Sequence, residues 1–171
     1  MLKLTLMRHG NAELPKAGSP DKDRRLTHQG KGDVSVGGAF IRDNDLIPDF
    51  ILCSDATRTR ETLSNLKPSL RQDIPTNYSK IIYSCSTGQS LIHLLEDLFE
   101  NHKHVLLIGH NPTLHEMALM LTFGRSEGTL LYNELRHDFA TSSICHIELQ
   151  TTSWQQAHSG GDLVHFVTPR R

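Results

Sequence analysis

Three short groups of polar residues in this sequence combine side chains that can bind and transfer a phosphoryl group. The groups are, in chain order, Arg8-His9-Gly10, Ser54-x-x-x-Arg58-x-x-x-Thr62 and Gly109-His110-Asn111-Pro112. A guanidinium can engage two phosphoryl oxygens at once, which suits Arg8 and Arg58 to that role. A neutral imidazole can attack phosphorus, and an imidazole with an ordinary pKa of about 6.5 is largely neutral at pH 7.

The chemistry that these groups predict is phosphoryl transfer through a histidine. We expect neighbouring guanidinium charges to keep His9 neutral, so that one ring nitrogen is free to act as the nucleophile and carry the phosphoryl group. We expect His110 and the two arginines to stabilise the charge that spreads over the equatorial oxygens. Gly10 allows a close approach of the backbone.

Each of the three groups follows a predicted strand. Apolar runs at Leu2 to Met7, Phe50 to Cys53 and Val105 to Ile108 predict strands, and the last has the continuous character of a strand covered on both faces. Ligands of open parallel sheets bind beyond the carboxyl ends of the strands. The three groups are therefore expected to meet at one edge of a sheet.

The segments between and after these strands predict the rest of the fold. A helical stripe runs from Leu91 to Phe99, and a second from Leu114 to Leu121 has Asn111 as its expected cap and Pro112 as its first residue. Strands alternating with helices predict an α/β fold with a mostly parallel sheet. The other expected elements are a long loop at Asn11 to Arg25, a helix at Thr59 to Leu70 broken near Pro68, and late strands at Ser143 to Leu149, Trp154 to His158 and Leu163 to Val167.

Composition excludes several classes of protein. The 171 residues suit one domain, 1–171, and 18 basic against 19 acidic residues give no broad positive field for nucleic acid or a membrane surface. No apolar run is long enough to span a bilayer, and we expect the first residues to lead into a short strand rather than to form the apolar region of a signal sequence. A cytoplasmic protein is therefore expected. Three cysteines without a C-x-x-C pair predict neither disulfides nor zinc knuckles. We also expect a monomer.

Together the three motifs resemble those of the histidine phosphatase superfamily, which includes the phosphoglycerate mutases. The short chain is most similar to the SixA-type phosphohistidine phosphatases. The resemblance implies a three-layer α/β/α sandwich with a mixed central sheet, His9 as the phosphorylated nucleophile, and Arg8, Arg58 and His110 as the rest of the phosphate site. It implies no metal and no other cofactor.

The chain departs from the family pattern in two places. Asp55 and Thr59 stand where the family usually has proline and alanine. The carboxylate that many members place after the third strand is missing from the segment Ile81 to Ser86, although Asp55 or Glu13 could serve as the acid. An alcohol needs such an acid to leave, whereas imidazole is protonated near pH 6.5 and needs much less help. The gap favours phosphohistidine as the substrate, for example on histidine-phosphotransfer domains in signal transduction.

Two other functions remain open from the sequence. One is a general phosphomonoesterase that acts on small phosphorylated molecules. The other is a phosphate-recognition module without turnover.

Further polar residues are weaker candidates for phosphate contacts. Asn111, from the third motif, is one of these candidates. Asn11 and Thr141 are two more, but Asn11 could equally form a turn, and Thr141 could simply begin a strand. Arg58 could instead pair with Asp55 or Glu61. The 11 histidines show no metal-binding spacing, and we expect His102 and His104 to face solvent.

Overall fold

The fold is built on a mixed six-stranded sheet. The computed structural model describes residues 1–98 and 101–169, and the strand order is β3-β2-β4-β1-β5-β6. Strands β1, β2, β3 and β4 run parallel, while β5 is antiparallel to β1 and to β6. The strands are β1 (Leu2–Arg8), β2 (Phe50–Ser54), β3 (Thr76–Ser79), β4 (His104–Gly109), β5 (Ile144–Leu149) and β6 (Gly161–Val167).

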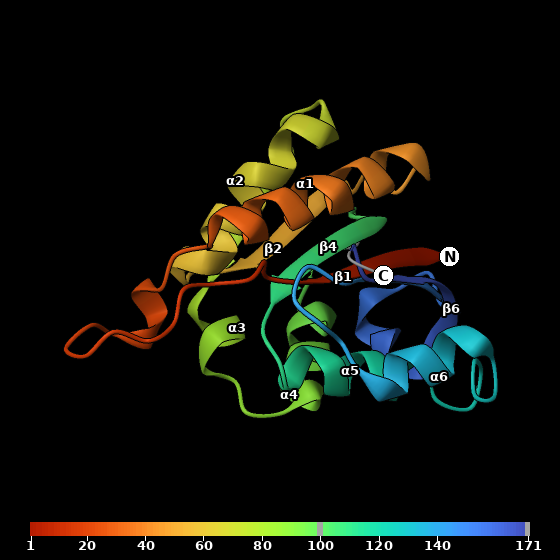
Figure 1. The fold of residues 1–171 in the computed structure, drawn as a ribbon. Coiled ribbons are helices and arrows are strands. Elements are labelled where there is room, and N and C mark those ends of the chain that lie inside the picture. Colours follow the sequence, from red (N-terminus) through yellow and green to blue (C-terminus); the bar gives the residue numbers. More distant parts are fainter. Residues whose placement is uncertain (99–100, 170–171) are drawn as a thin grey trace.

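Helices cover both faces of this sheet (Figure 1). One apolar core joins the sheet to α1 and α2, and the other joins it to α3, α4, α5 and α6. Leu4 and Leu6 of β1 point into the second core, whereas Met7 points into the first. The predicted α/β/α fold is confirmed. The helices are α1 (His28–Asp43), α2 (Thr57–Leu70), α3 (Lys80–Ser84), α4 (Gly88–Glu96), α5 (Thr113–Thr122) and α6 (Leu130–His137), with 3-10 turns η1 (Asp21–Asp23) and η2 (Trp154–Ser159).

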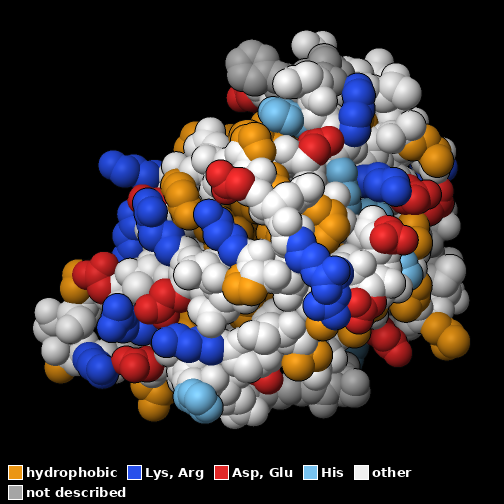
Figure 2. All heavy atoms as spheres, turned by 90° about the horizontal axis from the view of Figure 1, so that it is seen from above, with side chains coloured by type: hydrophobic (Ala, Val, Ile, Leu, Met, Phe, Trp, Pro, Cys, Tyr) orange, Lys and Arg blue, Asp and Glu red, His pale blue; other side chains and the backbone are white. Residues whose placement is uncertain are grey.

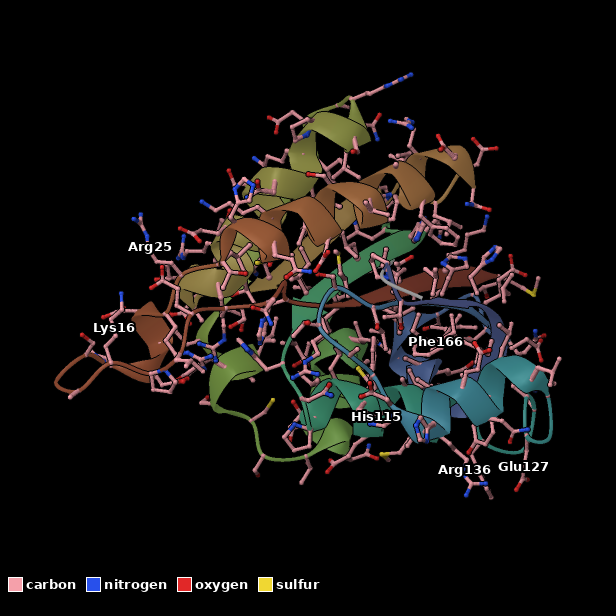
Figure 3. All side chains as sticks on the ribbon, viewed as in Figure 1. Lys16, Arg25, His115, Glu127, Arg136 and Phe166 are labelled. Carbon is pink, nitrogen blue, oxygen red and sulfur yellow. The ribbon has the colours of Figure 1, made fainter. Side chains whose placement is uncertain are left out.

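The three strands predicted to carry the site lie side by side. The partner of Arg8 across β1 and β4 is Gly109, and Cys53 of β2 pairs with Ile108 of β4. The parallel register brings the carboxyl ends of β1, β2 and β4 to one edge. The long loop expected at residues 11–25 leaves this edge, projects from the body of the fold and carries η1 near its end; Lys16 and Arg25 point outward from it (Figure 3).

Three predictions about secondary structure are wrong. Trp154 to His158 is not a strand but lies within η2, because Trp154 and Ala157 are spaced to bury one face of a helical turn and the indole donates to the carbonyl of His102 at 2.7 Å. Helix α2 does not break near Pro68, since Leu66 and Leu70 are buried on either side of it and hold the last turn. The cap of α5 is Pro112 rather than Asn111.

The surface agrees with the balanced composition. On the face seen when the molecule of Figure 1 is viewed from above, Lys and Arg side chains are interspersed with Asp and Glu side chains (Figure 2). No helix within the described residues is long and apolar enough to cross a membrane.

Candidate active site

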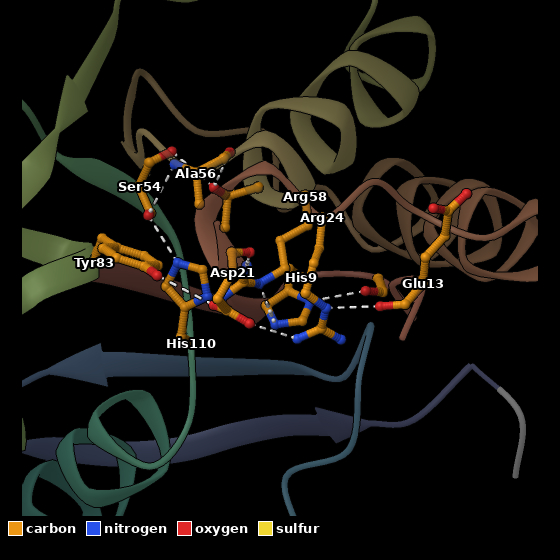
Figure 4. Close-up of polar contacts among 11 residues, drawn as sticks. His9, Glu13, Asp21, Arg24, Ser54, Ala56, Arg58, Tyr83 and His110 are labelled. Carbon is orange, nitrogen blue, oxygen red and sulfur yellow. Dashed lines mark hydrogen bonds and ion pairs between the residues drawn. The ribbon is translucent and has the colours of Figure 1, made fainter. Parts of the chain in front are cut away.

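The ends of β1, β2 and β4 bring four predicted residues together. Arg8 is the last residue of β1 and His9 directly follows it. Arg58 lies in the first turn of α2, and His110 directly follows β4. His9 is 8% exposed, Arg58 6% and His110 9%, so these groups are largely shielded from solvent. The rings of His9 and His110 lie 5.1 Å apart between centroids (Figure 4). We call these four residues the His9 cluster.

Hydrogen bonds fix which nitrogen of His9 is reactive. Nδ1 lies 2.7 Å from the carbonyl oxygen of Gly10, which can only accept, so Nδ1 carries the proton. Nε2 therefore holds the lone pair, and it accepts a hydrogen bond from Nε of Arg58 at 3.3 Å. Gly10 is itself held by its own N–H, which donates to the Thr62 hydroxyl at 3.0 Å. The local fold presents Nε2 as the nucleophilic atom.

Gly10 is needed at this position for packing. A Cβ there would lie 2.9 Å from the carbonyl oxygen of Gly30 and 2.9 Å from the Val34 side chain. Helix α1 could not then approach the loop as closely as it does. The third residue of the first motif therefore positions the chain that holds His9.

His110 is oriented by Ser54. Its Nε2 lies 2.8 Å from the Ser54 hydroxyl, while its Nδ1 is buried and has no partner among the described residues. If the hydroxyl donates to Nε2, the proton of the neutral ring is on Nδ1 and is available to an incoming oxygen. An unpaired buried donor is costly unless a ligand uses it.

Arg8 is held by the backbone of the segment before β5. Its Nη1 donates to the carbonyl oxygen of Phe139 at 2.9 Å, and Asn111 Nδ2 donates to the same oxygen at 3.0 Å. Nε of Arg8 is buried without a partner among the described residues. The predicted Asn111 thus shares an anchor with Arg8. Arg8 has a donor left for an anion, and so does His110 in the tautomer with its proton on Nδ1.

Arg58 makes its ion pair with a residue that the sequence did not single out. Its Nη2 lies 3.1 Å from Oδ2 of Asp21, and its Nη1 donates to the Asp21 carbonyl at 2.8 Å. The Tyr83 hydroxyl donates to the same Oδ2 at 3.1 Å. Arg58 pairs with neither of the carboxylates considered above, since Glu61 pairs with Arg25 and Asp55 with Lys22.

Burial and positive charge keep both histidines neutral. Burial, followed by the charges of Arg58 and Arg8, lowers the pKa of His9 to about 4, although the Gly10 carbonyl opposes the shift. Burial, then the neighbouring His9 and Arg58, lowers the pKa of His110 to about 3. At neutral pH the site therefore contains two guanidinium cations and two uncharged imidazoles, together with the Asp21 carboxylate that pairs with Arg58 and the charge of Asp138 that acts on Arg8. The two cations and the neutral imidazoles suit the site to a phosphoryl group.

The weaker candidates lie outside this cluster or act indirectly. The Asn11 side-chain oxygen accepts from Thr27, the cap of α1, at 3.1 Å, so it joins the loop to a helix 16 residues later rather than forming the expected turn. Thr141 is partly buried just before β5, and its contact with phosphate stays a prediction. Of the proposed acids, Asp55 is bound to Lys22 at 2.6 Å and Glu13 to Lys16 at 2.9 Å.

Asp21 and Tyr83 are the functional candidates that the sequence reading missed. Tyr83 lies within the segment Ile81 to Ser86, which has no carboxylate, and its ring is 5.5 Å from that of His110. Asp21 lies in the long loop, whose length was the one signal available. No group of three or more potential metal ligands occurs in the described part of the chain.

Comparison with known families agrees with this geometry. Residues 4–79 match the model of the histidine phosphatase superfamily (branch 1). The predicted resemblance to the histidine phosphatase superfamily is confirmed. The matched histidine phosphatase region holds Arg8, His9 and Arg58, while His110 lies beyond it. An uncharacterized protein of Mycobacterium tuberculosis is 29% identical over 165 residues, spanning 96% of this chain and 100% of that protein. An uncharacterized protein of Mycobacterium leprae is also 29% identical, over 169 residues, with 96% and 100% of the two chains covered.

Solved structures of histidine phosphatases share the fold. One is a crystal structure from Agrobacterium tumefaciens named as a phosphohistidine phosphatase SixA, which superposes on this chain with a TM-score of 0.81. The two sequences are 24% identical, and the superposition covers 97% of each chain. The protein histidine phosphatase SixA in complex with tungstate has a TM-score of 0.79 and 21% identity, with 99% and 98% covered. A phosphoserine phosphatase of Entamoeba histolytica is less similar, with a TM-score of 0.63, 14% identity, and 97% and 96% covered.

Proposed function

We propose that the protein is a metal-independent phosphatase that hydrolyses phosphohistidine through a phospho-His9 intermediate. The observation that carries the proposal is the lone pair of His9 Nε2, set among two guanidinium groups and a second neutral histidine. The family match supports a phosphatase, and the SixA structures support the compact form of the fold.

The first step starts from a phosphohistidine whose other ring nitrogen is protonated. His9 Nε2 gives up its hydrogen bond from Arg58 and forms the bond to phosphorus, while the bond to the leaving nitrogen breaks and its electron pair returns to the ring, which departs as neutral imidazole. The proton on His9 Nδ1 stays in place because the Gly10 carbonyl holds it. Arg8, Arg58 and His110 donate to the equatorial oxygens as charge spreads over them. Water then attacks phosphorus from the side opposite His9. The bond to Nε2 breaks, its electron pair returns to the His9 ring, and both protons of water leave with the product as dihydrogen phosphate.

The acids near the site favour a nitrogen leaving group. Hydrogen bonds from Arg24, Arg58 and Tyr83 lower the pKa of Asp21, so this carboxylate is a poor proton donor. The Asp55 carboxylate is bound to Lys22. An alkoxide would leave unprotonated from such a site, whereas neutral imidazole is a good leaving group. A protein that carries phosphohistidine, such as a histidine-phosphotransfer domain, is the substrate that we propose.

The second candidate is a phosphatase for small phosphomonoesters. Its support is Tyr83, whose ring lies 5.7 Å from the Arg58 guanidinium carbon and 5.5 Å from the His110 ring. Its hydroxyl, which donates to Asp21, could transfer its proton to an alkoxide instead. The distantly related phosphoserine phosphatase shows that the fold itself is compatible with that class of enzyme.

The test is trapping and removal of the intermediate. After brief exposure to a phosphohistidine peptide, the wild-type protein should carry acid-labile phosphate on His9. His9→Ala should lose this phosphate and lower turnover by about 10⁴-fold or more, as expected for a lost nucleophile. The matched control is His28→Ala, an exposed histidine at the start of α1.

Three outcomes separate the candidates. Faster turnover of alkyl phosphates than of phosphohistidine would favour the phosphomonoesterase. Tight binding of inorganic phosphate without any trapped phosphoenzyme would indicate a recognition module. Full activity of His9→Ala would end the proposal of a phosphohistidine intermediate at this residue.

A further inference from the structure

Asp21 is a charged group beside the nucleophile that the steps described above leave unused. Its Oδ2 accepts from Arg58 Nη2 and from the Tyr83 hydroxyl, both at 3.1 Å, and its Oδ1 accepts from Arg24 Nη1 at 2.9 Å. Its side chain is still 49% exposed. The carboxylate is therefore anchored beside the His9 cluster and accessible to a substrate.

The direction of Arg58 relates Asp21 to the reaction. Nε of this guanidinium faces His9 Nε2, whereas Nη1 and Nη2 face Asp21 (Figure 4). In an in-line displacement the leaving group lies on the side of phosphorus opposite the nucleophile. A phosphoryl group bound to Arg58 would have His9 Nε2 on one side of phosphorus, at the Nε end of the guanidinium. Its leaving group would then lie on the other side, toward Asp21.

We infer that Asp21 is a specificity-determining residue, whose carboxylate accepts a hydrogen bond from the second ring N–H of the departing phosphohistidine imidazole. This inference rests on the proposed function. When the P–N bond breaks, its electron pair goes to one ring nitrogen and the proton stays on the other. The product is then neutral imidazole rather than imidazolate, and a carboxylate at the N–H favours this protonated form.

Asp21 stays ionised in this role. The hydrogen bond from Arg24 is the main cause that lowers its pKa, and Arg58 and Tyr83 lower it further, while slight burial opposes the shift. The charged or titratable groups around it are Arg24 beside η1, Arg58 on α2, Tyr83 on α3, His110 after β4, and Lys22, which is paired with Asp55.

The same carboxylate works against an alkyl phosphate. The leaving group of an alkyl phosphate has no N–H that could donate a hydrogen bond to Asp21. The negative charges of the carboxylate and of the phosphoryl group then repel each other without a compensating hydrogen bond. An ionised Asp21 also has no proton to donate to the alkoxide. One residue would thus favour phosphohistidine and disfavour phosphomonoesters.

The test compares Asp21→Asn with wild type on three substrates. These are free phosphohistidine, phosphoserine and p-nitrophenyl phosphate, the last of which has a leaving group that needs no proton. We expect the ratio of kcat/KM for phosphohistidine to kcat/KM for p-nitrophenyl phosphate to fall about tenfold, the order of effect of one hydrogen bond to a charged group. The ratio for phosphohistidine to phosphoserine should fall at least as much.

Two variants control this measurement. Asp23→Asn removes the same charge from the same turn, and within the described part of the chain the Asp23 side chain pairs with neither Arg58 nor Tyr83; both ratios should remain as in wild type. Tyr83→Phe removes one of the hydrogen bonds that orient the carboxylate. It should lower the ratios in the same direction as Asp21→Asn but by less.

The pH profile provides a readout that a purely structural role would not move. In wild type the carboxylate raises the pKa of the substrate imidazolium, so phosphohistidine turnover persists to higher pH. In Asp21→Asn the alkaline limb should shift to lower pH for phosphohistidine and stay in place for p-nitrophenyl phosphate.

Several outcomes would overturn the inference. An equal change for all three substrates would show that Asp21 only positions or occupies Arg58, and unchanged ratios would show that it plays no part in specificity. Failure of the proposed function looks different, because wild type itself would then show no phosphohistidine turnover or no phosphate on His9.

Discussion

The fold contains two pairs of buried histidines that are alike in most measurable respects. In the His9 cluster, the rings of His9 and His110 are 5.1 Å apart, and His104 and His146 elsewhere in the sheet are 5.2 Å apart. Burial is the first cause that lowers the pKa in each case, to about 4 and 3 in the first pair and to about 4 and 3 in the second. Depressed pKa values alone therefore do not distinguish an active site from a structural site.

The pairs differ in where their ring nitrogens point. His104 Nε2 and His146 Nδ1 both lie 2.8 Å from the hydroxyl of Thr5, which can donate to one ring and accept from the other. In the His9 cluster, by contrast, Nδ1 of His110 and Nε of Arg8 are buried without partners in the described part of the chain. The structural pair is satisfied by its own fold, whereas the other retains donors for a ligand.

The first test of this difference between the two histidine pairs is to remove the His110 side chain. His110→Ala deletes a donor to the equatorial oxygens, and we expect kcat/KM for phosphohistidine to fall about 10² to 10³-fold, as for other groups that stabilise transition-state charge. The free energy of unfolding should fall by about 2 to 3 kcal/mol, because truncation leaves a cavity and removes the ring that bonds the buried Ser54 hydroxyl. Steady-state kinetics and urea unfolding measure the two effects.

The counterpart experiment is Ser54→Ala, which leaves the ring but removes its orienting hydroxyl. It should reduce kcat/KM by less than His110→Ala does. Unchanged activity in His110→Ala would remove this residue from the mechanism and leave the two histidine pairs equivalent.

The sequence predicted the His9 cluster better than it predicted the second pair. Arg8, Arg58 and His110 could be found because each follows a predicted strand, and the carboxyl ends of parallel strands meet. His104 was expected to face solvent and is instead 7% exposed, and its partner His146 was not singled out. The contact through Thr5 joins β1, β4 and β5, and nothing local in any one segment signals it.

The fold shows the same division between local and long-range information. The strands β1, β2 and β4 have local apolar patterns and were predicted, whereas β3 consists of partly buried and exposed residues and was missed. Helix α2 was also predicted in place, but the ion pair between Arg58 and Asp21 spans 37 residues of sequence. Such pairings depend on how the loop folds back, which residue types and spacing do not reveal.

The second test is the pH dependence of stability. All four histidines have a folded-state pKa below the unfolded value of about 6.5, so the unfolded chain binds more protons as the pH falls through this range. Stability is thus fully present above pH 6.5 and is lost as the pH falls toward 4 and 3. Each of the four histidines should contribute a loss of about 2 kcal/mol between pH 7 and 5, so urea unfolding should show a loss of about 7 kcal/mol in all.

Inorganic phosphate should separate the two pairs in that experiment. A bound dianion raises the pKa of His9 and His110, whereas His104 and His146 have no anion to respond to. NMR titration of the imidazole C–H resonances should therefore show phosphate-dependent shifts in the first pair alone. If all four titrated near 6.5, the burial argument for both pairs would be wrong.

The smallest expected effect comes from Thr5→Val, which keeps the β-branched shape and removes the hydroxyl shared by His104 and His146. Two buried ring nitrogens would lose their partner, and the free energy of unfolding should fall by about 2 kcal/mol. Thr5 lies four residues before His9, about 13 Å along β1, so kcat/KM should stay within about twofold of wild type. Thr5→Ser, which keeps the hydroxyl, should retain most of the stability. A loss of activity comparable with that of His110→Ala would mean that the second pair also supports catalysis, and the distinction between satisfied and unsatisfied histidines would no longer hold.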